Sequence, residues 1–124
     1  MSRSYILLAE DDPVIGEMIR LALEEGGENV VHVRDGAEAI AAVERQSPAL
    51  LLLDLLMPKM DGFRVLERMR EGGYGVRTVI LSNLSDEKSR DRCMALGAID
   101  FIVKSNIDEE FLVDLVRKHR QVGQ

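Results

Sequence analysis

Five residues whose side chains could do chemistry follow short apolar segments of the chain. They are Glu10, Asp11, Asp54, Ser82 and Lys104. Carboxylates held close together repel one another unless a cation neutralises them, and hard oxygen ligands favour Mg²⁺ or Mn²⁺. A hydroxyl group and an ammonium group add nothing to such a metal site, but they suit the oxygens of a phosphoryl group. If the fold brings the five residues together, they form a site for a carboxylate, a divalent cation and a phosphate.

The apolar segments have the pattern of short strands that are buried on both faces. Strands are predicted at residues 5–9, 30–33, 49–53, 78–81 and 99–103. Asp54 directly follows the most apolar of these runs, and we expect its carboxylate to be exposed at the end of a buried strand.

Segments with apolar residues at helical spacing separate the strands. Helices are predicted at residues 13–25, 37–43, 63–69, 85–96 and 111–116. The fourth is mostly polar, so we expect it to be the least firmly held, with the apolar anchors Cys93, Met94 and Leu96. The last has an apolar stripe formed by Phe111, Leu112, Leu115 and Val116.

The strict alternation of strands and helices predicts an α/β fold. We expect a doubly wound, five-stranded parallel sheet of the flavodoxin-like (βα)5 type, with strand order 2-1-3-4-5 and helices on both faces. In such sheets ligands bind beyond the carboxyl ends of the strands. The five chemically active residues follow strand ends, so they should meet at that edge.

Length and composition are those of one soluble domain. A chain of 124 residues buries roughly two thirds of the surface that its unfolded form exposes. The net charge of −6 disfavours direct binding to nucleic acid or to an anionic membrane. One cysteine excludes an intrachain disulfide, and no apolar run approaches the ~20 residues that span a bilayer. Because residues 1–4 leave no room for a signal peptide, we expect a cytoplasmic single domain over residues 1–124, with its core at about 5–120 and no output domain.

Four segments resemble the receiver domain of bacterial two-component response regulators. They are LLAEDDP at 7–13, LDLLMPKMDG at 53–62, ILS at 80–82 and GAIDFIVK at 97–104. Each motif is weak alone, but an acidic pair, an Asp followed by Met-Pro-x-Met-Asp-Gly, a hydroxyl and a Lys in this order are highly specific. The resemblance covers nearly the whole chain.

The resemblance implies a chemical role for the acidic residues. Asp54 would accept a phosphoryl group from a phosphohistidine on a histidine kinase or a histidine phosphotransfer protein. Glu10 and Asp11 would hold Mg²⁺, with Mn²⁺ as an alternative, and Asp54 and the backbone carbonyl of Leu56 would complete the protein ligands. Such a domain is a signalling switch and not a metabolic enzyme.

The resemblance also implies how the switch moves. Lys104 would pair with the phosphoryl group, and Ser82 would move to hydrogen-bond it. Phe101, three residues before the lysine, would turn inward as Ser82 moves. The output would be the face formed by the predicted helix 85–96, the strand 99–103 and the last helix, which would bind a downstream protein.

Several residues depart from the family pattern. Ser105 follows Lys104 where the family usually has proline, so we predict a trans bond there and a reshaped loop, since a cis bond without proline costs about 3 kcal/mol. Asn83 follows the hydroxyl residue Ser82, at a position where the family usually has a small residue, and it should narrow access to Asp54. Leu56 and Leu84 occupy two positions that tune dephosphorylation. Apolar side chains beside the phosphoryl group would not orient a water molecule, so we expect a long-lived phosphorylated form.

Two other functions are consistent with parts of this pattern. A receiver-like scaffold that no longer takes phosphate would explain Asn83 and Ser105, but the complete set of five residues argues against it. A Mg²⁺-dependent aspartyl-phosphate hydrolase would need a second acid two residues after its nucleophile, where this chain has Leu56. We interpret Asp12 as a helix cap and Cys93 as core packing, and we assign no function to His32 and His119.

Overall fold

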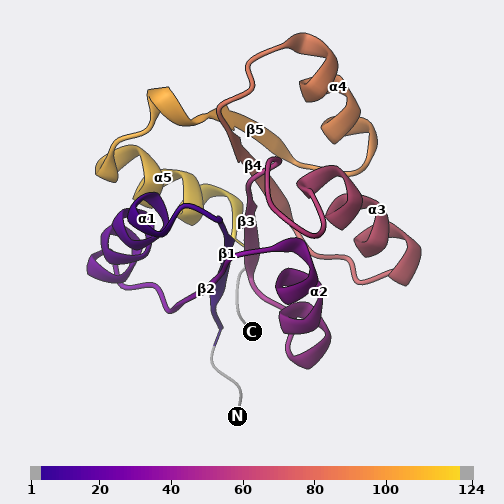
Figure 1. Ribbon diagram of the computed structural model, residues 1–124. Helices are drawn as coiled ribbons and strands as arrows, with labels where there is room; N and C mark the ends of the chain where they lie inside the picture. The colour runs from indigo at the N-terminus through magenta and orange to yellow at the C-terminus, as the bar shows by residue number, and fades with distance from the viewer. Residues whose placement is uncertain (1–3, 121–124) are drawn as a thin grey trace.

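The computed structural model describes residues 4–120, which form a five-stranded parallel sheet in the order β2-β1-β3-β4-β5 (Figure 1). The strands are β1 (Ile6–Ala9), β2 (Val30–Val33), β3 (Leu50–Leu53), β4 (Thr78–Ser82) and β5 (Asp100–Val103). The helices are α1 (Pro13–Glu25), α2 (Gly36–Arg45), α3 (Gly62–Gly72), α4 (Glu87–Ala95) and α5 (Glu109–His119). The predicted fold and strand order are confirmed.

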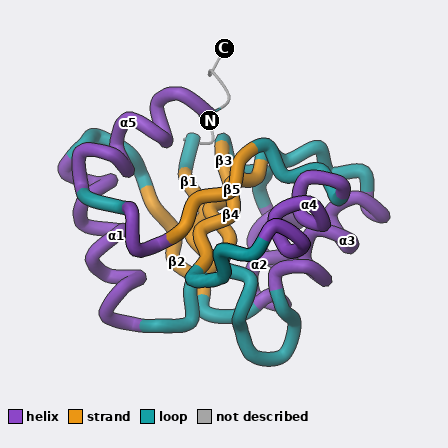
Figure 2. The backbone as a smooth tube through the Cα atoms, turned by 90° about the horizontal axis from the view of Figure 1, so that it is seen from above, coloured by secondary structure: helices purple, strands orange, loops and turns teal. Residues whose placement is uncertain are grey.

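Helices cover both faces of the sheet (Figure 2). Alternate strand residues point to opposite faces, so each strand contributes to two separate apolar clusters. Leu8, Leu52 and Leu81 pack with α1 and α5 on one face. Leu51, Leu53 and their neighbours pack with α2, α3 and Cys93 of α4 on the other. Because both faces are covered, the central strands are apolar throughout, which is the pattern that made them recognisable in the sequence.

All five α-helices begin after an aspartate whose carboxylate accepts backbone hydrogen bonds from the first turn. These N-cap residues are Asp12, Asp35, Asp61, Asp86 and Asp108. A carboxylate there satisfies N–H groups that have no partner within the helix and lies favourably in the helix dipole. The capping role predicted for Asp12 is therefore confirmed, and the same device fixes where each helix starts.

Helix α4 is the least firmly anchored, as predicted, and two of its three expected anchors, Cys93 and Leu96, pack against the core. Cys93 is its one buried residue, and burial raises the pKa of this thiol to about 11. Met94 is 38% exposed, because it lies about 100° around the helix from Cys93. For the same reason Phe111 of α5 is 38% exposed, while Leu112, Leu115 and Val116 form the buried stripe.

The segment after β5 leads into α5 through a short turn. Lys104 begins a single 3₁₀ turn, η1 (Lys104–Asn106), which the sequence did not predict. Among residues 4–120 every peptide bond is trans, so the predicted trans bond between Lys104 and Ser105 is confirmed. In the same part of the chain, no helix combines the length and apolar character needed to cross a bilayer.

Candidate functional site

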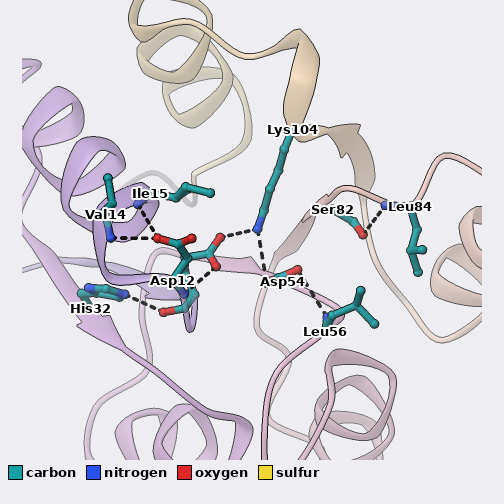
Figure 3. A network of polar contacts seen from close by, with 10 residues as sticks. Asp12, Val14, Ile15, His32, Asp54, Leu56, Ser82, Leu84 and Lys104 are labelled. Carbon is teal, nitrogen blue, oxygen red and sulfur yellow. Dashed lines mark hydrogen bonds and ion pairs between the residues drawn. The ribbon is translucent and has the colours of Figure 1, made fainter.

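Glu10, Asp11, Asp54 and Lys104 meet at the carboxyl edge of the sheet. Figure 3 shows the side chain of Lys104 pointing toward Asp54. The three acids each offer a carboxylate oxygen, and these oxygens lie within 4.8 Å of one another. The four residues line a cavity of about 390 Å³, together with Asp12, Pro13, Ile15, Leu56 and Asn83. The structure therefore brings together four of the five residues singled out from the sequence, and the fifth, Ser82, lies at the end of the neighbouring strand β4.

Lys104 joins the two most buried carboxylates of the cluster. Its Nζ contacts Oε1 of Glu10 and lies 3.2 Å from Oδ2 of Asp54. Burial alone would lower the pKa of Lys104, but the two carboxylates raise it above its ordinary value, so the side chain is an ammonium group. Three carboxylates and one ammonium leave a formal charge of −2 when all are ionised. A cluster of oxygens with that charge fits a hard divalent cation.

Glu10 is held in the turn between β1 and α1. Its side chain is only 2% exposed, and burial raises the pKa of its carboxyl group despite the ion pair with Lys104. The backbone N–H of Asp12 donates to Oε2 of Glu10 over 3.1 Å. Oδ1 of Asp12 in turn accepts from the N–H groups of Val14 and Ile15, at the first turn of α1. The cap of α1 thus also orders the turn that presents Glu10 and Asp11.

Asp54 is buried, so the expectation that its carboxylate would be exposed is wrong. The residue is 6% exposed, because it continues a central strand whose backbone is still paired with β1 through the bond from Asp54 N–H to Ala9 C=O. Its Oδ1 accepts from the N–H of Leu56 at 3.3 Å, and Oδ2 faces Lys104. Both oxygens have partners, and the carboxylate is reached through the cavity it lines.

The remaining predicted residues lie around this centre. Ser82 is fully buried, and its Oγ accepts from the N–H of Leu84 over 3.0 Å. Phe101 is also buried and already faces the core. Leu56 is 56% exposed at the cavity lining, whereas Leu84 packs against the α2–α3 side of the core and does not line the cavity. Of the two leucines expected beside the phosphoryl group, only Leu56 lines the cavity at Asp54.

The site has one neighbour that the sequence did not indicate, His32 of β2. Its Nε2 lies 2.7 Å from the backbone oxygen of Glu10, and its ring lies against Gly16 of α1. A glycine in the middle of a predicted helix was the available signal, because such a position often marks a close contact. His119, the other histidine, pairs with Asp100 at 2.9 Å.

The loop from Asp54 to Gly62 depends on a close backbone contact. A Cβ at Gly62 would lie 2.5 Å from the carbonyl oxygen of Asp54 and 2.8 Å from Cα of Leu55. We expect Gly62→Ala to lower the free energy of unfolding by about 2 kcal/mol, because backbone atoms cannot move aside as side chains do. Urea titration measures the loss. At Gly26 the nearest atoms are methyl groups of Val113 at 3.0 Å, so Gly26→Ala is the milder control; equal losses for both variants would contradict the prediction.

A doubly wound parallel sheet with an acidic cluster and a lysine at its carboxyl edge defines a class of α/β proteins. The family model of the response regulator receiver domain matches residues 6–117 of the chain. The chain belongs to this family, whose members are signalling domains of two-component systems.

Individual relatives agree with the family model. The probable transcriptional regulatory protein TcrX of Mycobacterium tuberculosis is 32% identical over 118 residues, which are 95% of this chain but 50% of that protein. An uncharacterized 14.6 kDa protein of Leptolyngbya boryana is 33% identical over 96% of this chain and 92% of its own length. The BeF3-activated receiver domain of Klebsiella pneumoniae RstA has a TM-score of 0.86 at 29% identity, covering 94% of this chain and 97% of that one. The chain thus spans about half of the regulator TcrX and nearly all of the Leptolyngbya protein.

Proposed function

We propose that the protein is a phosphorylation switch of a two-component phosphorelay, in which Asp54 accepts a phosphoryl group from a phosphohistidine. The observation that carries the proposal is the carboxylate of Asp54 at a cavity, 3.2 Å from the Lys104 ammonium and grouped with Glu10 and Asp11. A histidine kinase or a histidine phosphotransfer protein would donate the phosphoryl group in the cytoplasm.

The reaction exchanges one bond to phosphorus for another. An oxygen of Asp54 attacks the phosphorus atom, the P–N bond to the donor imidazole breaks, and its electron pair returns to that nitrogen. The product is an acyl phosphate on Asp54. Glu10, Asp11, Asp54 and the carbonyl of Leu56 would hold Mg²⁺ (or Mn²⁺), which when bound offsets the negative charge of the reacting oxygens. Lys104 would exchange its contact with the Asp54 carboxylate for one with the phosphoryl oxygens.

Ser82 links the site to the neighbouring loop. Its Oγ accepts from the N–H of Leu84, a residue of the loop that leads into α4, so a movement of Ser82 toward a phosphoryl group on Asp54 would pull on this loop. Because helix α4 buries a single side chain, displacing it costs little free energy. A local electrostatic change at Asp54 would in this way shift the face formed by α4, β5 and α5, which we propose binds a downstream protein.

A second surface suits a protein donor. A groove of about 480 Å³ between α1 and the start of α5 shares Ile15 and Lys104 with the cavity at Asp54. Its lining includes the apolar residues Met18, Ile19 and Leu112 and the acidic residues Glu25, Asp108 and Glu109. An apolar groove with acidic residues that opens beside the reacting carboxylate favours a donor that is a protein rather than a small phosphoester.

Mass spectrometry after incubation with acetyl phosphate tests the proposed function. We expect a single phosphoryl adduct on the intact protein in Mg²⁺ buffer. When EDTA removes the metal we expect no adduct, because nothing then offsets the negative charge of the clustered carboxylates and the phosphoryl oxygens. Absence of an adduct in Mg²⁺, with failure to bind beryllofluoride, would instead favour the non-phosphorylated scaffold. Steady release of phosphate from small phosphoesters would favour the aspartyl-phosphate hydrolase.

The phosphorylated form is expected to be long-lived because of Leu56. This exposed apolar side chain lines the cavity at the position where a polar side chain could orient a water molecule against the phosphoryl group. We expect Leu56→Asn to shorten the lifetime severalfold, as measured by loss of the adduct after the phosphodonor is removed. Leu21→Asn, an exposed leucine of α1 outside the cavity lining, should leave the lifetime unchanged. Decay of the wild-type adduct within seconds would contradict this prediction.

A further inference from the structure

Helix α1 contains a glycine in its interior, where glycine normally destabilises a helix. Gly16 is the fourth residue of α1 and is buried. A helix-interior glycine costs about 1 kcal/mol relative to alanine. A Cβ at this position would lie 2.1 Å from Cε1 and 2.4 Å from Nε2 of His32. The glycine therefore leaves room for the imidazole between α1 and β2.

The imidazole occupies this space in one defined orientation. His32 pairs with Leu8 across the β1–β2 register and directs its ring along the α1 side of the sheet. Its Nε2 lies 2.7 Å from the backbone oxygen of Glu10 (Figure 3). A carbonyl oxygen only accepts, so Nε2 carries the hydrogen and donates it.

This hydrogen bond completes the support of Glu10. The N–H of Glu10 donates to Val33 C=O at 3.0 Å, and its carboxylate accepts from Asp12 N–H and contacts Lys104. His32 satisfies the remaining backbone group, the carbonyl, at the peptide that leads to Asp11. The orientation of this peptide fixes where the side chains of Glu10 and Asp11 begin relative to Asp54.

We propose that His32 is a positioning residue for the metal site. Through the Glu10 carbonyl it holds the β1–α1 turn so that the oxygens of Glu10 and Asp11 keep the spacing that a divalent cation requires. The inference rests on the proposed function, because it assigns Mg²⁺ to the acidic cluster. Outer partners that orient metal-binding groups typically change metal affinity by 10- to 100-fold when they are removed.

The test is the Mg²⁺ dissociation constant, measured by calorimetry without any phosphodonor. We expect His32→Leu to raise this constant on the order of tenfold. In His32→Gln the amide nitrogen reaches about as far as Nε2 and can donate the same hydrogen bond, so this variant should bind Mg²⁺ nearly as the wild type does. Thermal unfolding of the metal-free variants separates loss of stability from loss of affinity. Unchanged affinity in His32→Leu, or an equal loss in His32→Gln, would overturn the proposal.

Gly16 gives a second approach that keeps the histidine. Gly16→Ala should raise the Mg²⁺ dissociation constant because the new methyl group displaces the ring, but it should have no further effect in a His32→Ala background, where the ring is gone. Equal effects in both backgrounds would count against the proposal, even if His32→Leu does not fold. A wild type that binds no Mg²⁺ would overturn it outright. A wild type that binds Mg²⁺ and depends on His32, but takes no phosphate, would uphold it and remove only the proposed function.

Discussion

Replacing Asp54 by asparagine is expected to abolish the phosphoryl adduct completely while the protein stays folded. The amide has nearly the same shape as the carboxylate but is not a nucleophile toward phosphorus. Its single oxygen can still accept from Leu56 N–H, and Lys104 loses its partner at Asp54 but keeps its contact with Glu10. One charge fewer in a cluster of three carboxylates also relieves repulsion. Because this relief opposes the loss of the pair with Lys104, the free energy of unfolding in metal-free buffer should stay close to that of the wild type.

Intact mass after incubation with acetyl phosphate and Mg²⁺ measures the adduct on this variant. Asp61→Asn is the matched control, because Asp61 lies in the same loop but caps α3 by accepting from Arg64 N–H, which asparagine can also do. The control should be phosphorylated like the wild type. An adduct on Asp54→Asn would show that another side chain takes the phosphoryl group, and the assignment of Asp54 would then be wrong.

The order of strands and helices could be predicted because several local signals agree. Continuous apolar runs mark strands covered on both faces, and pairs such as Asp12-Pro13 mark helix starts. The position of the candidate site followed from topology, since carboxyl ends of parallel strands share one edge. This reasoning needs only local pattern and general rules of α/β folds, so it placed Glu10, Asp11, Asp54 and Lys104 together.

The details it missed depend on contacts between distant segments. The burial of Asp54 results from its central place in the sheet and from the approach of Lys104, fifty residues further along the chain. The hydrogen bond of His32 depends on the β1–β2 register, and no periodicity in the sequence reveals it. Leu84 was expected at the phosphoryl site but packs into the core, because the loop after β4 turns its side chain toward the α2–α3 side.

Of the substitutions considered, Lys104→Met is expected to cause the largest loss of stability in metal-free buffer. Methionine fills a similar volume but leaves Glu10 and Asp54 without the ammonium group that both contact. Glu10 is 2% exposed, so its unpaired charge is poorly solvated. We expect the free energy of unfolding to fall by about 3 kcal/mol, at the low end of the roughly 3–5 kcal/mol typical of a broken buried pair, because the cavity admits water.

Urea titration in EDTA and then in Mg²⁺ distinguishes electrostatic from packing effects in this variant. If the loss is electrostatic, Mg²⁺ should stabilise Lys104→Met more than the wild type, because the cation then supplies the positive charge that the lysine no longer provides. Lys59→Met is the control: Lys59 pairs with Asp35 at 3.4 Å but is largely exposed, so its loss should matter little with or without Mg²⁺. An equal gain in unfolding free energy from Mg²⁺ in Lys104→Met and in the wild type would mean that Lys104 stabilises the site by packing. The proposal that Lys104 moves its contact from Asp54 to the phosphoryl oxygens would then lose its electrostatic basis.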